Sequence, residues 1–147
     1  MIAIVDYRAG NLTSVQLAFR ALGCEAAVTS DPQTILSASR VVFPGVGAAG
    51  SAMRNLAELG LVPVLKEVAA NGIPFLGICL GTQILLDFSE EDGGTPTLGI
   101  LPGRVPRFQP SDPWEIGRAS CRERVELPVF AVSVKKKRET RGTPTPD

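Results

Sequence analysis

Residues 72–83 constrain the fold of this chain more than any other stretch, and they read Gly-Ile-Pro-Phe-Leu-Gly-Ile-Cys-Leu-Gly-Thr-Gln. The apolar run 75–78 is typical of a strand buried on both faces. The spacing of Ile84, Leu85 and Phe88 predicts a helix from Thr82 onward. Between strand and helix, two glycines flank Cys79 and leave room for a sharp reversal of the chain. The pattern therefore predicts a strained turn that holds the Cys79 side chain outward.

Cys79 is the candidate nucleophile of this turn. A sulfur at a helix N-terminus is favoured as the thiolate, because the helix dipole lowers the pKa of the thiol. In such a turn the residue after the nucleophile, here Leu80, offers its backbone N–H to an oxyanion. The alternative is a structural cysteine in a core strand, since free cysteine is among the most buried residue types. The flanking glycines favour the nucleophile.

Strand and helix patterns alternate along the chain. Strands are expected at residues 2–6, 26–29, 41–43 and 75–78, and helices near 15–22, 33–38, 51–59 and 63–70. This rhythm predicts an α/β fold with a mostly parallel sheet and helices on both faces. The loops 6–11, 44–47 and 77–81 all follow strands, where ligands bind in such folds. A non-catalytic, flavodoxin-like binding module would place its loops in the same way. Residues 98–105 are expected to begin an antiparallel segment.

Length and composition narrow the class of protein. The 147 residues allow one domain of ordinary size. No window approaches 18 uncharged apolar residues and no secretory signal is apparent, so no membrane partner is expected. Three cysteines and no histidine argue against a disulfide framework and a metal site, and suit a reducing cytoplasm. We expect no cofactor and no nucleic-acid partner.

Three segments together resemble a known family. Gly77-Ile-Cys-Leu-Gly-Thr-Gln83 resembles the nucleophile motif of class I glutamine amidotransferases, which release ammonia from glutamine for a synthase partner. Ile4-Val-Asp-Tyr-Arg-Ala-Gly-Asn-Leu-Thr-Ser-Val15 and Val42-Phe-Pro-Gly-Val-Gly-Ala48 resemble one subfamily, the glutaminase subunits of imidazole glycerol phosphate synthase in histidine biosynthesis. Members of the class from vitamin B6, tryptophan or purine pathways share the cysteine turn but fit the 6–11 loop less well.

The resemblance implies specific roles for residues at the ends of the strands. It implies glutamine as the substrate, Cys79 as the nucleophile, and the backbone N–H groups of Leu80 and Val46 as the oxyanion hole. It implies substrate contacts from four further residues, which are Gly45, Gly47, Gly81 and Gln83. It also implies a heterodimer with a (β/α)8-barrel cyclase that docks near Gly10 and Asn11. The simpler interpretation of Asn11 is a cap on the helix that follows.

The resemblance runs from Met1 to about Trp114. The family takes the histidine and glutamate of its triad from a later segment, and this sequence contains no histidine. From Glu115 the string Glu-Ile-Gly-Arg-Ala-Ser-Cys-Arg-Glu-Arg-Val resembles a translated sequencing adapter. We therefore expect residues 1–114 to be a partial amidotransferase domain whose sheet is incomplete at its C-terminal side. Residues 115–147 are expected to be an artefactual, disordered tail, with a divergent natural tail as the alternative. The chain itself should be nearly inactive.

Overall fold

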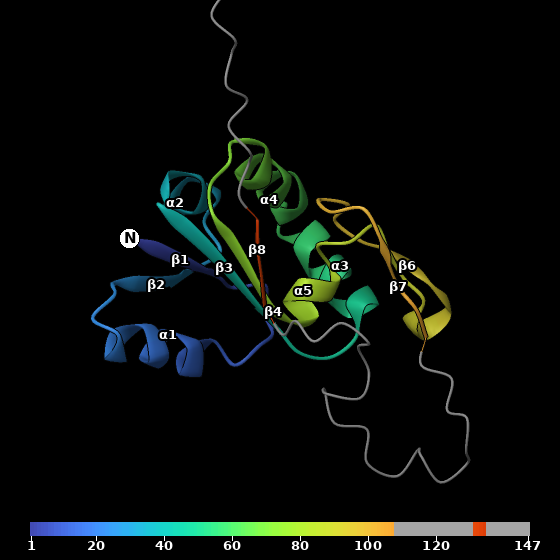
Figure 1. The fold of residues 1–147 in the computed structure, drawn as a ribbon, viewed down its shortest axis with the longest axis horizontal. Helices are drawn as coiled ribbons and strands as arrows, with labels where there is room; N and C mark the ends of the chain where they lie inside the picture. The colour runs from blue at the N-terminus through green and yellow to red at the C-terminus, as the bar shows by residue number, and fades with distance from the viewer. Residues whose placement is uncertain (108–130, 135–147) are drawn as a thin grey trace, which may run out of the picture.

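The computed structural model describes residues 1–107 and 131–134, which build a mostly parallel sheet with helices on both faces (Figure 1). The strand order is β2-β1-β3-β4-β8. The first four strands of the chain are mutually parallel, and β8 is antiparallel to β4. Their bounds are β1 Ile2–Val5, β2 Ala26–Thr29, β3 Arg40–Gly45, β4 Phe75–Cys79 and β8 Ala131–Val134. The predicted α/β architecture is confirmed.

Helices occupy both faces of this sheet. One face carries α1 (Leu12–Ala21), and the other carries α2 (Pro32–Ser37), α3 (Ala49–Glu58) and α4 (Leu61–Ala70). The start of α2 follows from its sequence, because Pro32 fits the first turn and the Asp31 carboxylate accepts the Thr34 N–H at 2.8 Å. The Thr34 hydrogen bonds hold the pKa of Asp31 below its usual range. Within the described residues, no helix has the length and apolar character needed to cross a membrane.

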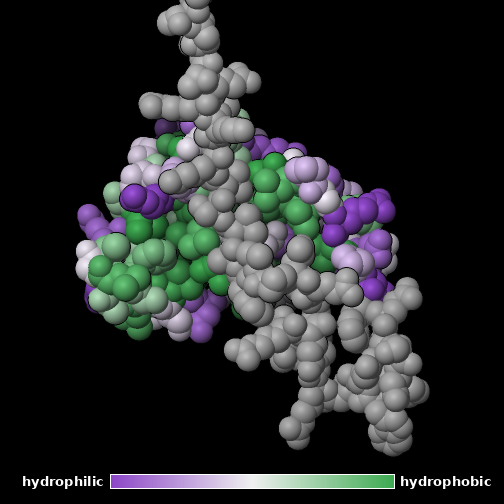
Figure 2. Space-filling view, viewed as in Figure 1, coloured by the Kyte–Doolittle hydropathy of each residue, from purple (hydrophilic) through white to green (hydrophobic). Residues whose placement is uncertain are grey.

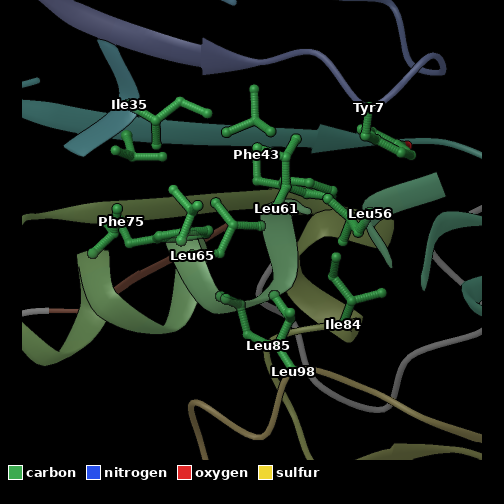
Figure 3. Close-up of a cluster of buried hydrophobic side chains, with 14 of the residues drawn as sticks. Tyr7, Ile35, Phe43, Leu56, Leu61, Leu65, Phe75, Ile84, Leu85 and Leu98 are labelled. Carbon is green, nitrogen blue, oxygen red and sulfur yellow. The ribbon is translucent and has the colours of Figure 1, made fainter. Parts of the chain in front are cut away.

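The larger core lies between the sheet and α2, α3 and α4 (Figure 3). Large side chains that are 0 % exposed meet there from both layers, and they include Phe43, Phe75, Ile35, Leu56, Leu61 and Leu65. Burying an aliphatic or aromatic side chain of this size stabilises the fold by about 1.5–3 kcal/mol. This face of the sheet therefore fixes the positions of β1, β3 and β4.

The opposite face is covered more thinly. In the described part of the chain, Ile2, Ile4 and Val42 pack under α1, which has no fully buried residue. An apolar hollow of about 300 Å³ remains between α1 and β4, and we call it the α1–β4 hollow. Its lining residues are Asn11, Ser14, Val15, Ala18, Phe19, Leu22 and Ile78. Apolar residues gather on this part of the surface in Figure 2.

The helix after Cys79 is shorter than predicted. Helix α5 spans only Leu80–Gln83, so the expectation of a helix that includes Phe88 is wrong. The carbonyls of Ile84, Leu85 and Leu86 accept backbone N–H groups of residues 98–101 at 2.8–2.9 Å. These bonds divert the chain from helical pairing. Ile84 and Leu85 are still buried, as their apolar spacing predicts.

Residues beyond α5 form a small second sheet in the order β6-β5-β7. Its strands are β5 Phe88–Ser89, β6 Thr95–Pro96 and β7 Arg104–Val105, with a 3-10 helix at Glu91–Gly93. Strand β7 pairs with β5 in parallel, so the antiparallel expectation for this segment is wrong there. The reason is local, because Asp87 exchanges two 2.9 Å bonds with Gly103 and so aligns the two segments.

Four residues of the tail, Ala131–Val134, form β8 where the sequence favoured disorder. They pair with β4 from Phe75↔Val134 to Ile78↔Ala131. The edge of β4 is therefore covered along these residues. The expected boundary at residue 114 and the rest of the tail lie outside the described residues, so the division of the chain there stays a prediction.

Candidate functional site

The carboxyl ends of β1, β3 and β4 bring the three suspected loops to one edge of the sheet. The register places Gly45 opposite Cys79, so residues 44–47, which we call the oxyanion loop, begin beside the cysteine turn. A Cβ placed on Gly10 would lie 3.4 Å from the Pro44 carbonyl oxygen, which shows that the 6–11 loop touches the oxyanion loop. The loops converge as the parallel-sheet pattern predicts.

Cys79 ends β4 and has the strained backbone that the glycine-flanked pattern predicts. Its φ is 56° and its ψ is −118°. Among the described residues, only Arg8 and Cys79 are non-glycine residues with positive φ. Such conformations cost about 1–3 kcal/mol and persist where the surroundings enforce them. The Thr82 hydroxyl contributes by donating a 2.9 Å hydrogen bond across the turn to the Gly77 carbonyl.

Glycines let the backbones around Cys79 approach closely. A Cβ on Gly81 would overlap the Phe43 carbonyl oxygen, one on Gly77 would lie 2.6 Å from the Gly81 oxygen, and one on Gly45 would lie 2.6 Å from the Gly81 nitrogen. At Gly47 the space around an added Cβ is open, and glycine is favoured there by the backbone conformation, a φ of +86°. Gly45 and Gly81 thus have a packing role, and the substrate contacts expected of them and of Gly47 stay predictions.

The two expected oxyanion donors lie in adjacent segments. Leu80 is the first residue of α5, where backbone N–H groups have no acceptor within the helix. Val46 follows Gly45 in the oxyanion loop, but its N–H donates to the Tyr7 hydroxyl at 3.2 Å. The Val46 side chain is 52 % exposed. The roles of Leu80 and Val46 as oxyanion donors stay predictions, and the Val46 N–H is already bonded to Tyr7.

Tyr7 is a residue of the site that the sequence patterns do not single out, because they indicate only that it belongs to the 6–11 loop. Its side chain is 0 % exposed and its ring stacks on Phe43 with centroids 4.7 Å apart. Burial raises the pKa of the Tyr7 hydroxyl, the bond from Val46 opposes this, and negative charge at Cys79 raises it further. The hydroxyl is therefore protonated at neutral pH. The available signal was the only tyrosine of the chain, placed directly after the first strand.

The other expected site residues surround this centre. Gln83 is the last residue of α5 and is half-buried. The Asn11 side-chain oxygen Oδ1 accepts the Ser14 N–H at 3.4 Å, so Asn11 caps α1 as the simpler interpretation proposed. Gly10 has a φ of +109°. Contacts of Gln83 with substrate, and of Gly10 and Asn11 with a partner, remain untested predictions.

Comparison with known proteins identifies relatives of this chain. A family model described as glutamine amidotransferase class-I matches residues 3–143. Three relatives carry the name imidazole glycerol phosphate synthase subunit HisH. The protein of Desulfovibrio desulfuricans is 54 % identical over 82 % of this chain and 55 % of its own length. The protein of Symbiobacterium thermophilum is 46 % identical over 99 % of this chain and 64 % of its own length. The protein of Nitratidesulfovibrio vulgaris is 50 % identical over 76 % of this chain and 52 % of its own length.

The chain spans between about half and two thirds of the length of these relatives. A crystal structure of a glutamine amidotransferase superposes with a TM-score of 0.61 at 21 % identity, covering 73 % of this chain and 57 % of the other. At that identity the likeness shows the fold. Because the family model matches most of the sequence and the three relatives are 46–54 % identical to it, the chain belongs to the glutamine amidotransferase class-I family.

Proposed function

We propose that this chain carries the nucleophile half of a glutaminase, with Cys79 attacking the side-chain amide of glutamine. The observation that carries the proposal is the strained turn at Cys79, with its φ of 56°, directly opposite Gly45. This arrangement puts a sulfur nucleophile beside the loop that contains the Val46 N–H. Both are parts that acyl transfer from an amide requires.

In the proposed reaction, the Cys79 thiolate adds to the amide carbon and the carbonyl oxygen becomes an oxyanion. The N–H groups of Leu80 and Val46 stabilise that oxyanion, and each such donor is typically worth about 10²–10³ in rate. Collapse of the tetrahedral adduct breaks the C–N bond, and the leaving ammonia takes a proton. Water then hydrolyses the glutamyl thioester to glutamate. Gly45, Gly47, Gly81 and Gln83 surround the substrate.

The reaction also needs a group that takes the thiol proton and delivers a proton to ammonia. Related enzymes of the triad type use a histidine held by a carboxylate. This sequence contains no histidine. Because losing a triad member removes several orders of magnitude of rate, we expect the chain as given to show no glutamine turnover above background.

The names of the relatives suggest where the ammonia goes. Three relatives are subunits named for imidazole glycerol phosphate synthase. We extend this to the present chain and propose a cytoplasmic heterodimer in histidine biosynthesis. In that complex a (β/α)8-barrel cyclase docks at the loop with Gly10 and Asn11 and receives ammonia to make imidazole glycerol phosphate.

Selective labelling of Cys79 tests the proposal without requiring turnover. A diazoketone analogue of glutamine alkylates a bound thiol with loss of dinitrogen. We expect it to label Cys79 well before the exposed Cys24, with excess glutamine protecting Cys79. Iodoacetamide, which needs no glutamine site, should modify Cys24 readily in the same sample. Peptide mass spectrometry assigns each label to its cysteine and so distinguishes Cys79 from Cys24.

The matched control is Cys79→Ala, which should remove the protected label and leave Cys24 alkylation unchanged. Equal diazoketone labelling of Cys24 and Cys79, or labelling that glutamine does not slow, would contradict the glutaminase proposal. That result would instead favour a non-catalytic relative.

A further inference from the structure

We propose that Tyr7 is a positioning residue that restrains the oxyanion loop, because its hydroxyl accepts the Val46 N–H that an oxyanion would otherwise take. The proposal rests on the proposed function, in which Val46 is an oxyanion donor. The hydrogen bond joins Val46 N to Tyr7 Oη at 3.2 Å. A backbone N–H carries one proton, so the bond to Tyr7 and a bond to an oxyanion compete. We call the Tyr7–Val46 bond the latch.

The Tyr7 end of the latch is fixed. The side chain is 0 % exposed, and its ring lies on Phe43 with an interplanar angle of 23°. Phe43 belongs to β3, and Tyr7 follows the neighbouring strand β1 by two residues. Close packing of this kind leaves little room for the hydroxyl to move. Opening the latch therefore requires motion of Val46.

The Val46 end is free to move by comparison. Its side chain is 52 % exposed, and a Cβ added to the following Gly47 would meet nothing within 4 Å. Gly47 has a φ of +86°, a region where glycine changes conformation at low cost. A rotation of the peptide that carries the Val46 N–H is thus the motion that opens the latch.

The latch also lies close to the nucleophile. Gly45, directly before Val46, is the register partner of Cys79. Tyr7 is near enough to Cys79 that negative charge on the sulfur raises the pKa of the phenol. The same hydroxyl could instead donate its own proton to an adduct on Cys79. The two roles predict opposite effects when the hydroxyl is removed, so one variant separates them.

The test uses the full chain with Tyr7→Phe, which keeps the ring and deletes the acceptor. The probe is the γ-aldehyde analogue of glutamine. The Cys79 sulfur bonds to the aldehyde carbon, the π pair moves to oxygen, and that oxygen takes the thiol proton, so nothing leaves. Aldehyde affinity is read from how strongly it slows iodoacetamide alkylation of Cys79, with Cys24 as the internal reference.

We expect Tyr7→Phe to bind the aldehyde about 2- to 10-fold more tightly, the range that one neutral hydrogen bond supplies. The alkylation rate without aldehyde should change by less than about 2-fold, since displacement of iodide needs no oxyanion donor. If Tyr7 had only a structural role, its substitution would change aldehyde binding and the alkylation rate without aldehyde together. Unchanged or weaker aldehyde binding overturns the latch, and weaker binding assigns the hydroxyl as a donor.

A second measurement covers the case in which the variant fails to fold. In the wild type, NMR signals of the Val46 amide and the Tyr7 ring should both shift when the aldehyde adduct forms, because their bond breaks. Tyr7 signals that stay in place overturn the latch. If the wild type forms no adduct at Cys79, the proposed function fails. If it forms the adduct and only the Tyr7 effects are absent, the latch alone fails.

Discussion

At the scale of single residues, the site depends on positions where no side chain fits. Gly45, Gly77 and Gly81 each face backbone atoms of a neighbouring segment within 2.6 Å of where a Cβ would stand. Backbone atoms cannot rotate aside as the end of a flexible side chain can, so a methyl group there forces α5 away from the strands. The contact between β3 and α5 is therefore the least tolerant point of the site.

We expect Gly81→Ala to lower the free energy of unfolding by about 3 kcal/mol or more, at the top of the range for overpacking. The matched control is Gly23→Ala, where φ is +70° but nothing lies within 4 Å of the added Cβ. That control should cost about 1–2 kcal/mol from backbone strain alone. Urea unfolding measures both, and equal costs would show that the Phe43 contact is unimportant.

Single residues also show what sequence can and cannot reveal about the site. The Cys79 turn is predictable, because two glycines at fixed spacing between a strand and a helix leave few other conformations. The engagement of Val46 is not, because it depends on Tyr7, which is 39 residues away in the chain. No local pattern reports a hydrogen bond of that separation. The edge of the sheet that carries the site could be predicted from the sequence, but the hydrogen-bond partners at that edge could not.

At the scale of elements, α1 is attached to the sheet by only part of its apolar surface. Asn11 begins the helix as its cap, and Gly23, with a φ of +70°, lies just after its end. Phe19 packs against the cluster formed by Ile2, Ile4 and Val42. Leu17 and Leu22 are 53 % and 75 % exposed. The helix thus has an attached face and an exposed apolar face.

Alanine substitutions should separate these two faces. We expect Phe19→Ala to destabilise the fold by about 1–2 kcal/mol, below the 3–5 kcal/mol of a fully buried phenylalanine because Phe19 is only half-buried. Leu17→Ala should stay within about 0.5 kcal/mol. Thermal or urea unfolding of the pair is the measurement. Similar costs for both would mean that α1 packs differently from this structure.

The regular elements up to Cys79 could be predicted from the sequence, whereas the structure after α5 could not. Alternating patterns predicted β1, β2, α2, β3 and α4 to within one or two residues, because each pattern depends on local spacing. The prediction of a longer helix at α5 is wrong because it depended on local spacing alone. The carbonyls after α5 pair with residues 98–101, and such pairing is decided by tertiary contacts rather than by propensity. Two-residue strands such as β5 and β7 carry too little pattern to read.

At the scale of the whole molecule, β4 is the strand on which the site depends, and β8 covers its outer side. The four pairs from Phe75↔Val134 to Ile78↔Ala131 extend to the residue before Cys79. An uncovered strand presents unpaired N–H and C=O groups and invites association with other chains. The tail residues 131–134 therefore contribute to order at the site, whatever their origin.

Truncating the chain after residue 130 tests this contribution. Removal of β8 should speed hydrogen exchange at the β4 amides that lose partners and should raise the tendency to aggregate. Amides of β1, which pairs with β2 and β3 on its two sides, serve as the internal reference. Hydrogen exchange with mass spectrometry and light scattering give the two readouts. Unchanged protection of β4 would show that β8 adds nothing to the stability of the sheet.

The close approach of Gly81 to Phe43 has a consequence for substitutions in the core around it. The spacing between the Cys79 turn and β3 is set by the main-chain atoms of Gly81 and Phe43. Hydrophobic residues of the surrounding core can therefore be exchanged for others of similar volume while this main-chain spacing is kept. A solved structure that is only 21 % identical to this chain has the same fold.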